Sequence, residues 1–322
     1  MATVTIPPGE PVVSRRVMTL YVLLAVALLP QIAILAVTLP NRAVVGHWTL
    51  AWAGFTILVA FGLVTTAVCV VRNSPWTVVA ASATGVIVFV DAWFDLMTRQ
   101  GPGDLGPPVV RVLLLKLPLG VLCMVATVAV IRRLSAGRNL IGRAGLGWQD
   151  GAFVAVQPPA AGDADAERVA AALDATGPGR LDEPPLVAPW VVRVYLVAAV
   201  AALLSLVVVT LQPPEQLATN WTTSWVGFDL LMAAAFAVTV VAARVRSPIA
   251  IAALAADAAI LVCDGWFDTM TAHGGTELAI AVFCALAVEL PLAVFSLVIA
   301  HRAVTRIAAA RSLLARADVA VT

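Results

Sequence analysis

The sequence predicts an all-α polytopic membrane protein with eight transmembrane helices, arranged as two parallel four-helix repeats. Of its 322 residues, 61% are hydrophobic and 12% are charged, and this charged share is about half that of a typical soluble domain. The apolar residues gather into blocks of about 20, the helix length that crosses a hydrocarbon layer ~30 Å thick. The same order of blocks and of rare residues occurs twice. We therefore expect a lipid bilayer around most of the chain.

Composition excludes several other classes of protein. The net charge is only +1, so we expect no nucleic-acid partner. The four cysteines lie within apolar blocks without the spacing of a disulfide framework or a zinc site. The three histidines lie near the ends of predicted spans and have no ligand spacing, and no glycine-rich phosphate loop, HExxH motif or nucleophile elbow is present.

Eight spans are expected, and proline or glycine residues punctuate the segments between them. The spans lie near residues 17–39, 49–71, 76–98, 108–131, 190–211, 222–243, 248–270 and 278–300. The apolar run that follows Arg15 and Arg16 is too long for a typical cleaved signal segment. We expect it to remain as the first span.

The positive residues predict the direction of the spans. Sixteen of the twenty Lys and Arg residues fall on the side of the N-terminus, whereas only Arg42, Arg99 and Arg111 fall on the other side. Positive residues near span ends are retained in the cytoplasm. Both termini are therefore expected to be cytoplasmic, and the remaining cation, Lys116, lies inside a span.

The expected domain organisation follows from these spans. It comprises a disordered N-terminus (1–14), a first repeat (15–133), a cytoplasmic linker (134–189), a second repeat (190–302) and a cytoplasmic tail (303–322). The linker is rich in Gly, Pro, Ala and Asp, and it has too few large apolar residues to fold alone. Residues 163–175 could form a short helix, and the tail is expected to extend the last helix beside anionic headgroups.

When the sequence is shifted along itself so that Trp48 aligns with Trp221, its two halves align without a gap through three spans and into a fourth. Residues that this alignment pairs are called equivalent. Further equivalent residues are Trp52, Gly54 and Phe55 with Trp225, Gly227 and Phe228, the segment from Asp91 to Asp95 with that from Asp264 to Asp268, and Pro118 with Pro291. An even number of spans per unit, joined by a cytoplasmic linker, puts both units the same way up. Such parallel repeats are related by an axis along the membrane normal, and the site often lies at the repeat interface.

Two segments carry a resemblance to a known group of proteins. The segments HWTLAWAGF, of the form HWxLAWxGF, and DAWFD resemble those of uncharacterised actinobacterial four-helix integral membrane proteins, here as a tandem duplication. The resemblance covers most of both halves and implies the topology and the pairing of the segment from Trp48 to Phe55 with that from Asp91 to Asp95. We expect a location in the bacterial cytoplasmic membrane. It implies no chemistry, and the halves are not chemically alike, because Asp229 stands where the first half has Thr56.

The DAWFD motifs supply the first candidate site residues. Asp91 and Asp95 are four residues apart, so they project from one face of a helix, and Lys116 enters the next span to a similar depth as Asp91. A salt bridge between Lys116 and Asp91 is therefore plausible. The corresponding pair in the second half is Asp264 and Asp268. Supporting aromatic residues within the two motifs are Trp93, Phe94, Trp266 and Phe267.

The second half has more acids and no lysine. Glu289 replaces Lys116, and Asp229, Asp264, Asp268 and Glu289 are expected to converge. Four neighbouring carboxylates cannot all ionise at low cost, so either some stay protonated or Lys116 or a bound cation compensates them.

One further acid lies deeper. Asp257 precedes Asp264 by seven residues and is expected on the same helical face, close to the membrane midplane. A charged Asp there costs about 2.5 to 3.5 kcal/mol on insertion scales. Pro118 and Pro291 follow Lys116 and Glu289 by two residues and either expose backbone carbonyls by kinking the helices or are ordinary membrane-helix prolines.

Three functions stay open on the sequence alone. The first is movement of a proton, cation or small solute through an outward-facing acidic cavity between the repeats. The second is a membrane-embedded enzyme that acts on a lipid or prenyl substrate, with a divalent cation or acid and base chemistry at the twin DxxxD motifs. The third is a non-catalytic assembly or interaction protein that binds another membrane protein, in which the polar residues fix helix packing.

Overall fold

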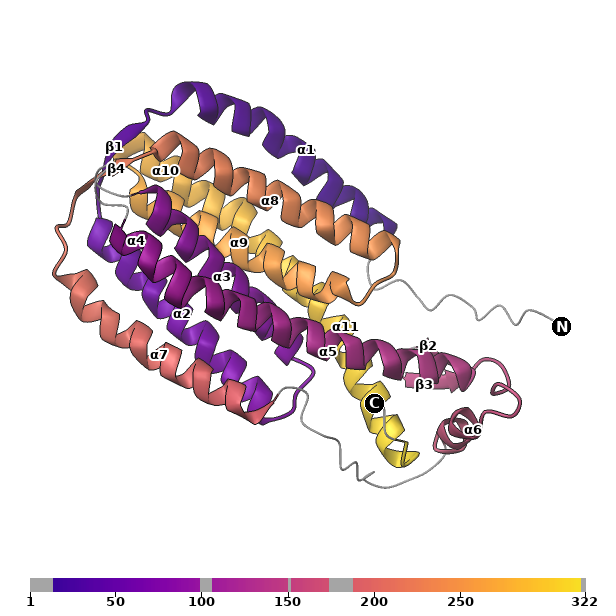
Figure 1. The fold of residues 1–322 in the computed structure, drawn as a ribbon. Helices are drawn as coiled ribbons and strands as arrows, with labels where there is room; N and C mark the ends of the chain where they lie inside the picture. Colours follow the sequence, from indigo (N-terminus) through magenta and orange to yellow (C-terminus); the bar gives the residue numbers. More distant parts are fainter. Residues whose placement is uncertain (1–13, 99–105, 150–151, 174–187, 320–322) are drawn as a thin grey trace.

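The computed structural model describes residues 14–98, 106–149, 152–173 and 188–319 (Figure 1). Residues 1–13, Arg99 and the end of the linker lie outside this described part, so nothing follows for the expected disorder of the N-terminus. Eight helical segments are long and apolar enough to cross a membrane. The predicted fold class, an all-α polytopic membrane protein, is confirmed.

Six spans are single helices and two are composite. The single helices are α1 (Arg15–Thr38), α2 (Trp48–Val71), α3 (Thr77–Met97), α7 (Pro189–Thr210), α8 (Trp221–Arg244) and α9 (Ile249–Thr271). The fourth span consists of α4 (Gly106–Arg111), a π-helix η1 (Val112–Lys116) and α5 (Leu117–Arg143). The eighth consists of α10 (Gly275–Cys284), a π-helix η2 (Ala285–Glu289) and α11 (Leu290–Arg316).

The two π-helices occupy equivalent positions in the two halves, and each directly precedes a Leu-Pro pair. In a regular α-helix, the ring of Pro118 or Pro291 would collide with the carbonyl four residues earlier. The wider turn relieves this collision, and the N–H groups of Leu117 and Leu290 donate to carbonyls five residues back. The prolines thus widen the helices at Lys116 and Glu289.

Helices α3 and α9 form the centre of the bundle and pack on each other. Helix α1 lies along α8, and α7 lies along α2 (Figure 1). The first span of each sequence half therefore packs on the second span of the other half. Lipid-facing side chains explain why α1 and α7 carry so many exposed Leu and Val residues.

Two short strands join the halves at one end of the bundle. Strands β1 (Arg42–Val45) and β4 (Gln216–Thr219) follow α1 and α7 and pair antiparallel. In their register Val44 faces Leu217, which is its equivalent in the second half. Helices α1 and α7 therefore end at the same end of the bundle, which we call the β1–β4 end.

Tryptophans cross between the halves in a reciprocal manner. The indole N–H of Trp93 on α3 donates to the Ser224 carbonyl at 2.9 Å, and that of Trp266 on α9 donates to the Ala51 carbonyl at 3.0 Å. Each ring lies against a glycine of the other half, Gly227 or Gly54, where any Cβ would overlap it. The two tryptophans are equivalent residues, and so are the two residues whose carbonyls accept.

At the opposite end, α5 and α11 extend beyond the bundle and carry a small packed unit (Figure 1). It adds the hairpin β2 (Leu146–Gln149) and β3 (Ala152–Ala155) and the helix α6 (Ala164–Ala171). Its core contains Leu140, Leu146, Val169, Leu313 and Leu314. The hairpin and α6 therefore pack on the end of α5, where the linker begins, and on the end of α11, which adds Leu313 and Leu314 to the apolar residues of the linker. Helix α6 lies where a short helix was expected.

Candidate functional site

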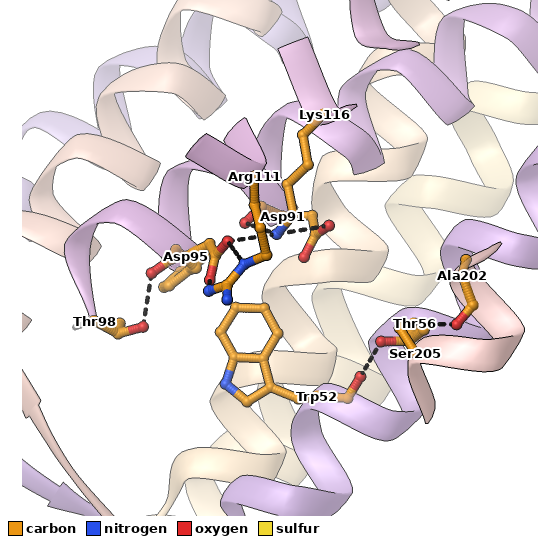
Figure 2. Close-up of polar contacts among 10 residues, drawn as sticks. Trp52, Thr56, Asp91, Asp95, Thr98, Arg111, Lys116, Ala202 and Ser205 are labelled. Carbon is orange, nitrogen blue, oxygen red and sulfur yellow. Dashed lines mark hydrogen bonds and ion pairs between the residues drawn. The ribbon is translucent and has the colours of Figure 1, made fainter. Parts of the chain in front are cut away.

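The charged residues of the first half form one compact group, the paired cluster, made of Asp91, Asp95, Arg111 and Lys116. The Lys116 ammonium lies 3.0 Å from one carboxylate oxygen of each aspartate. Arg111 binds Asp95 with two hydrogen bonds, of 2.7 and 3.1 Å. Figure 2 shows both cations reaching from the fourth span toward the two aspartates of α3. Two carboxylates and two cations neutralise each other there.

The π-helix explains why both cations face α3. Arg111 directly precedes η1 and Lys116 ends it, so the two are five residues apart. Backbone hydrogen bonds in a π-helix also join residues five apart, so the two side chains lie on nearly the same side of the helix. The Lys116 ammonium also donates to the Asp91 backbone carbonyl at 3.3 Å and lies 6.0 Å from the Trp52 ring centroid, within the range of a cation–π contact.

The acids of the second half form a different group, the acidic cluster, made of Asp229 on α8, Asp264 and Asp268 on α9, and Glu289 at the end of η2. Asp264 interacts electrostatically with the other three. Asp229 is 1% exposed, Glu289 7% and Asp264 9%, whereas Asp268 is less buried. The structure thus brings together the four acids that were expected to converge.

Nothing in the described part of the chain forms an ion pair with the acidic cluster. The two cations of the paired cluster have been replaced, since Glu289 is the equivalent of Lys116 and Cys284 is the equivalent of Arg111. Among the described residues, the Oδ2 atom of Asp229 and the Oε2 atom of Glu289 have no hydrogen-bond partner. The side chain of Gln31 on α1 lies beside the Asp229 carboxyl group.

Glycine at one position makes room for the longer acid. A Cβ at Gly265 would overlap the Oε2 atom of Glu289. Glu289 therefore lays its carboxylate over the backbone directly beside Asp264. The first half has Ala92 at the equivalent position, because the Lys116 ammonium reaches further, toward Asp95.

Asp257 is fully buried at a deeper level and belongs to a separate polar group. Thr239 on α8 donates to its Oδ2 atom at 2.5 Å. Its electrostatic neighbour is Tyr21, whose hydroxyl lies 2.5 Å from that of Ser296. The first half has the neutral pair Thr66 and Thr84, 3.0 Å apart, at the positions equivalent to Thr239 and Asp257.

Aromatic rings from both halves pack together around Phe94 and Phe267, which directly precede Asp95 and Asp268. Phe94 stacks on Phe267 with ring centroids 4.5 Å apart. Around this stack lie Trp52, Phe55, Trp225 and Phe228. Lys116, which the sequence offered as a countercharge for the second-half acids, forms its ion pairs with the first-half aspartates instead.

Sequence reasoning found the salt bridge between Asp91 and Lys116 but missed several partners. The charge distribution places Arg111 only on the outer side, although its alignment with Cys284 marks it as a residue that differs between the halves. Trp52 and Gly265 were noted only as part of the repeat. No sequence signal could have identified Gln31, since its span packs on the opposite half.

Within the described residues, no group of three His, Cys, Asp or Glu side chains is arranged to hold a metal ion. The acidic cluster is therefore a group of electrostatically coupled carboxylates and not a preformed set of metal ligands. It can take up protons or a cation that makes longer hydrogen-bonded contacts.

No protein-family model matches the chain, and no curated protein or solved structure is significantly similar to it. The fold and its apolar helices define a multi-pass membrane protein that lies in a lipid bilayer.

Proposed function

We propose that this membrane protein moves a small cation, either a proton or another monovalent cation, through its second half, with the acidic cluster as the binding site. One observation carries the proposal. The four acids share an interior site without any paired cation in the described part of the chain, whereas the equivalent first-half site contains Lys116 and Arg111.

The physical argument rests on desolvation. An ionised acid at the centre of a membrane helix costs about 2.5 to 3.5 kcal/mol on insertion scales, and the cost decreases toward the helix ends. Neighbouring carboxylates add mutual repulsion, so all four cannot be ionised at low cost without a counterion. The site must therefore bind protons or an external cation. Groups that exchange such ligands within a membrane interior are typical of transport pathways.

We propose further that the chain consists of two parallel four-helix repeats in the bacterial cytoplasmic membrane, with both termini cytoplasmic and with kinship to the actinobacterial DAWFD proteins. The reciprocal contacts of Trp93 and Trp266 and the facing pair Val44 and Leu217 support a twofold relation between the halves. The distribution of Lys and Arg supports the orientation. In this orientation the acidic cluster is nearer the outer surface, because α9 ends at the β1–β4 end.

The metal-dependent enzyme is the less favoured alternative. Asp91 and Asp95 use carboxylate oxygens in ion pairs with Lys116 and Arg111, and these are the oxygens that a divalent cation would need. A twin DxxxD metal site would therefore require the first-half pairs to break.

The test is cation flux into liposomes that contain the purified protein. We expect flux of protons or of a monovalent cation in wild type, and a loss of roughly tenfold or more in the double variant D264N/E289Q, the equivalent of at least about 1.4 kcal/mol. The control is E215Q, which removes an exposed acid at the same end of the bundle. Wild-type flux that the double variant leaves unchanged would overturn the proposal, as would no flux of any cation from a monodisperse wild-type protein.

A further inference from the structure

The paired cluster shows how this fold binds an ammonium group, and the acidic cluster keeps most of the same binding groups. We propose that the acidic cluster binds the primary ammonium group of a small amine. This inference rests on the proposed role of the cluster as a cation site and names the class of cation that it takes.

The first half displays the ammonium site in its occupied form. The Lys116 ammonium contacts the Asp91 carboxylate at 3.0 Å, the Asp95 carboxylate at 3.0 Å and the Asp91 backbone carbonyl at 3.3 Å. A primary ammonium group has three N–H donors, and these three acceptors can satisfy them all. The Trp52 ring supplies a fourth, cation–π contact (Figure 2).

Each of these binding groups has a counterpart in the second half. Asp264, Asp268 and Trp225 are the equivalents of Asp91, Asp95 and Trp52. Trp225 also keeps the packing of Trp52. Its ring lies 6.2 Å from Phe228 and 5.7 Å from Phe94, and the Trp52 ring lies 6.4 Å from Phe55 and 5.9 Å from Phe267. The acceptors and the tryptophan are retained, whereas the tethered ammonium of Lys116 and the guanidinium of Arg111 are gone.

Two buried oxygens point to a ligand from outside the chain. Glu289 replaces the lysine, and its carboxylate lies over Gly265 beside Asp264 with Oε2 unpartnered among the described residues. Asp229 is an electrostatic neighbour of Asp264, and its Oδ2 atom also has no hydrogen-bond partner among the described residues. Glu289 is 7% exposed and Asp229 1%. Buried acceptors without donors are costly, and a donor with several N–H groups would satisfy them.

The geometry favours a hydrogen-bonding cation over a metal ion or a quaternary one. The described residues contain no group of three metal-ligating side chains, whereas N–H donors bind oxygen at about 3 Å. A quaternary ammonium ion could use the Trp225 ring but has no N–H to donate to the aspartates. A free amine and the headgroup of an ethanolamine phospholipid share the required chemistry.

The experiment measures equilibrium binding of radiolabelled methylammonium to the full-length protein in phosphatidylcholine nanodiscs. We expect saturable binding that unlabelled ammonium ions displace and that tetramethylammonium and sodium do not. Adding an ethanolamine phospholipid to the nanodiscs distinguishes the sources. Competition by this lipid would identify a headgroup as the natural ligand, and its absence would favour a soluble amine. Displacement by tetramethylammonium as effective as that by ammonium would overturn the inference.

The decisive variant is E289K, which supplies a tethered ammonium at the position that Lys116 occupies in the first half. We expect it to lower methylammonium affinity by roughly tenfold or more and to raise the Tm, while E215Q retains wild-type affinity. If E289K does not fold, D268N replaces it, with the same expected loss of affinity. Wild-type affinity in the folded variant would contradict the inference.

Binding and flux separate this inference from the proposed function. Methylammonium binding without flux of any cation would overturn transport and leave the amine site standing. Flux of protons or sodium without methylammonium binding would overturn the amine site alone.

Discussion

The paired cluster and the acidic cluster occupy equivalent places on α3 and α9, yet they have opposite electrostatic character. In the first half Lys116 and Arg111 neutralise two aspartates. In the second half Glu289 and Cys284 stand at the positions of those cations, and Asp229 adds a fourth acid. The comparison teaches that the same arrangement of helices can contain two kinds of charged cluster. In the first the protein neutralises its own charges, and in the second the acids need a ligand. The difference lies at the ends of the two π-helices.

The first way to break the comparison concerns the two reciprocal tryptophans, Trp93 and Trp266, which should matter equally in both halves. W93A and W266A each remove an indole that fills the space over a glycine of the other half and donates to a carbonyl. We expect each to destabilise the protein by about 3 kcal/mol, as for other large-to-small changes. Thermal unfolding in detergent checks this. A Tm loss confined to one variant would show that the halves do not support each other reciprocally.

The second prediction concerns the lysine that distinguishes the clusters. K116M leaves Asp91 without a cation and Asp95 with Arg111 only, so we expect a loss of about 3 kcal/mol and a lower Tm. The control K116R keeps the charge and should retain most of the Tm. If K116M unfolds at the wild-type temperature, the paired cluster does not stabilise the fold.

A third experiment sharpens the comparison by emptying the first-half site. K116A removes the tethered ammonium but keeps its acceptors, Asp91 and Asp95, and its aromatic wall at Trp52. We expect n-propylammonium to restore much of the Tm that K116A loses, because its three carbons and ammonium group match the atoms that the substitution removes. Tetramethylammonium at equal concentration serves as the control and should restore none. Equal recovery with both salts would indicate a general salt effect.

The fourth prediction concerns the glycine beside Glu289. G265A forces the Glu289 carboxylate away from Asp264, so methylammonium affinity should fall several-fold, an effect of roughly 1 kcal/mol. The matched change in the first half is A92G, which removes a methyl group at the equivalent position and should leave that affinity unchanged. Equal effects of the two variants would argue against a specific role of Gly265.

The smallest effect is expected at Arg111. Its side chain is 51% exposed, so solvent screens its ion pair with Asp95. R111M should therefore cost at most about 1 kcal/mol, in the range of surface pairs. A Tm loss as large as that of K116M would show that Arg111 contributes to the paired cluster as much as the lysine does.

Much of the fold could be predicted because the bilayer dictates the length and composition of each span. The pair of Asp91 and Lys116 followed from helical periodicity and equal depth. The packing of α1 on α8 and of α7 on α2 could not be predicted, because apolar faces in lipid carry no directional signal. The duplication itself stays a prediction, supported by contacts at equivalent positions.

The candidate site could be predicted less completely than the fold. Periodicity put Asp257 on the face of Asp264, but it could not show that Thr239 and Tyr21 would be its neighbours. Nor could it show that Lys116 would pair with the first-half aspartates alone, since this depends on which helices meet.

Carbodiimide labelling tests the central claim most directly, because dicyclohexylcarbodiimide modifies buried carboxyl groups that carry a proton and spares carboxylates held in ion pairs. After labelling of the wild-type protein, mass spectrometry should find Asp264 or Glu289 modified, as N-acylurea or as N-methylamide. The sum of the two products should decrease as methylammonium is added, and Asp91 and Asp95 should be unmodified. Equal labelling of the two clusters, or labelling of the acidic cluster that methylammonium does not reduce, would contradict the account.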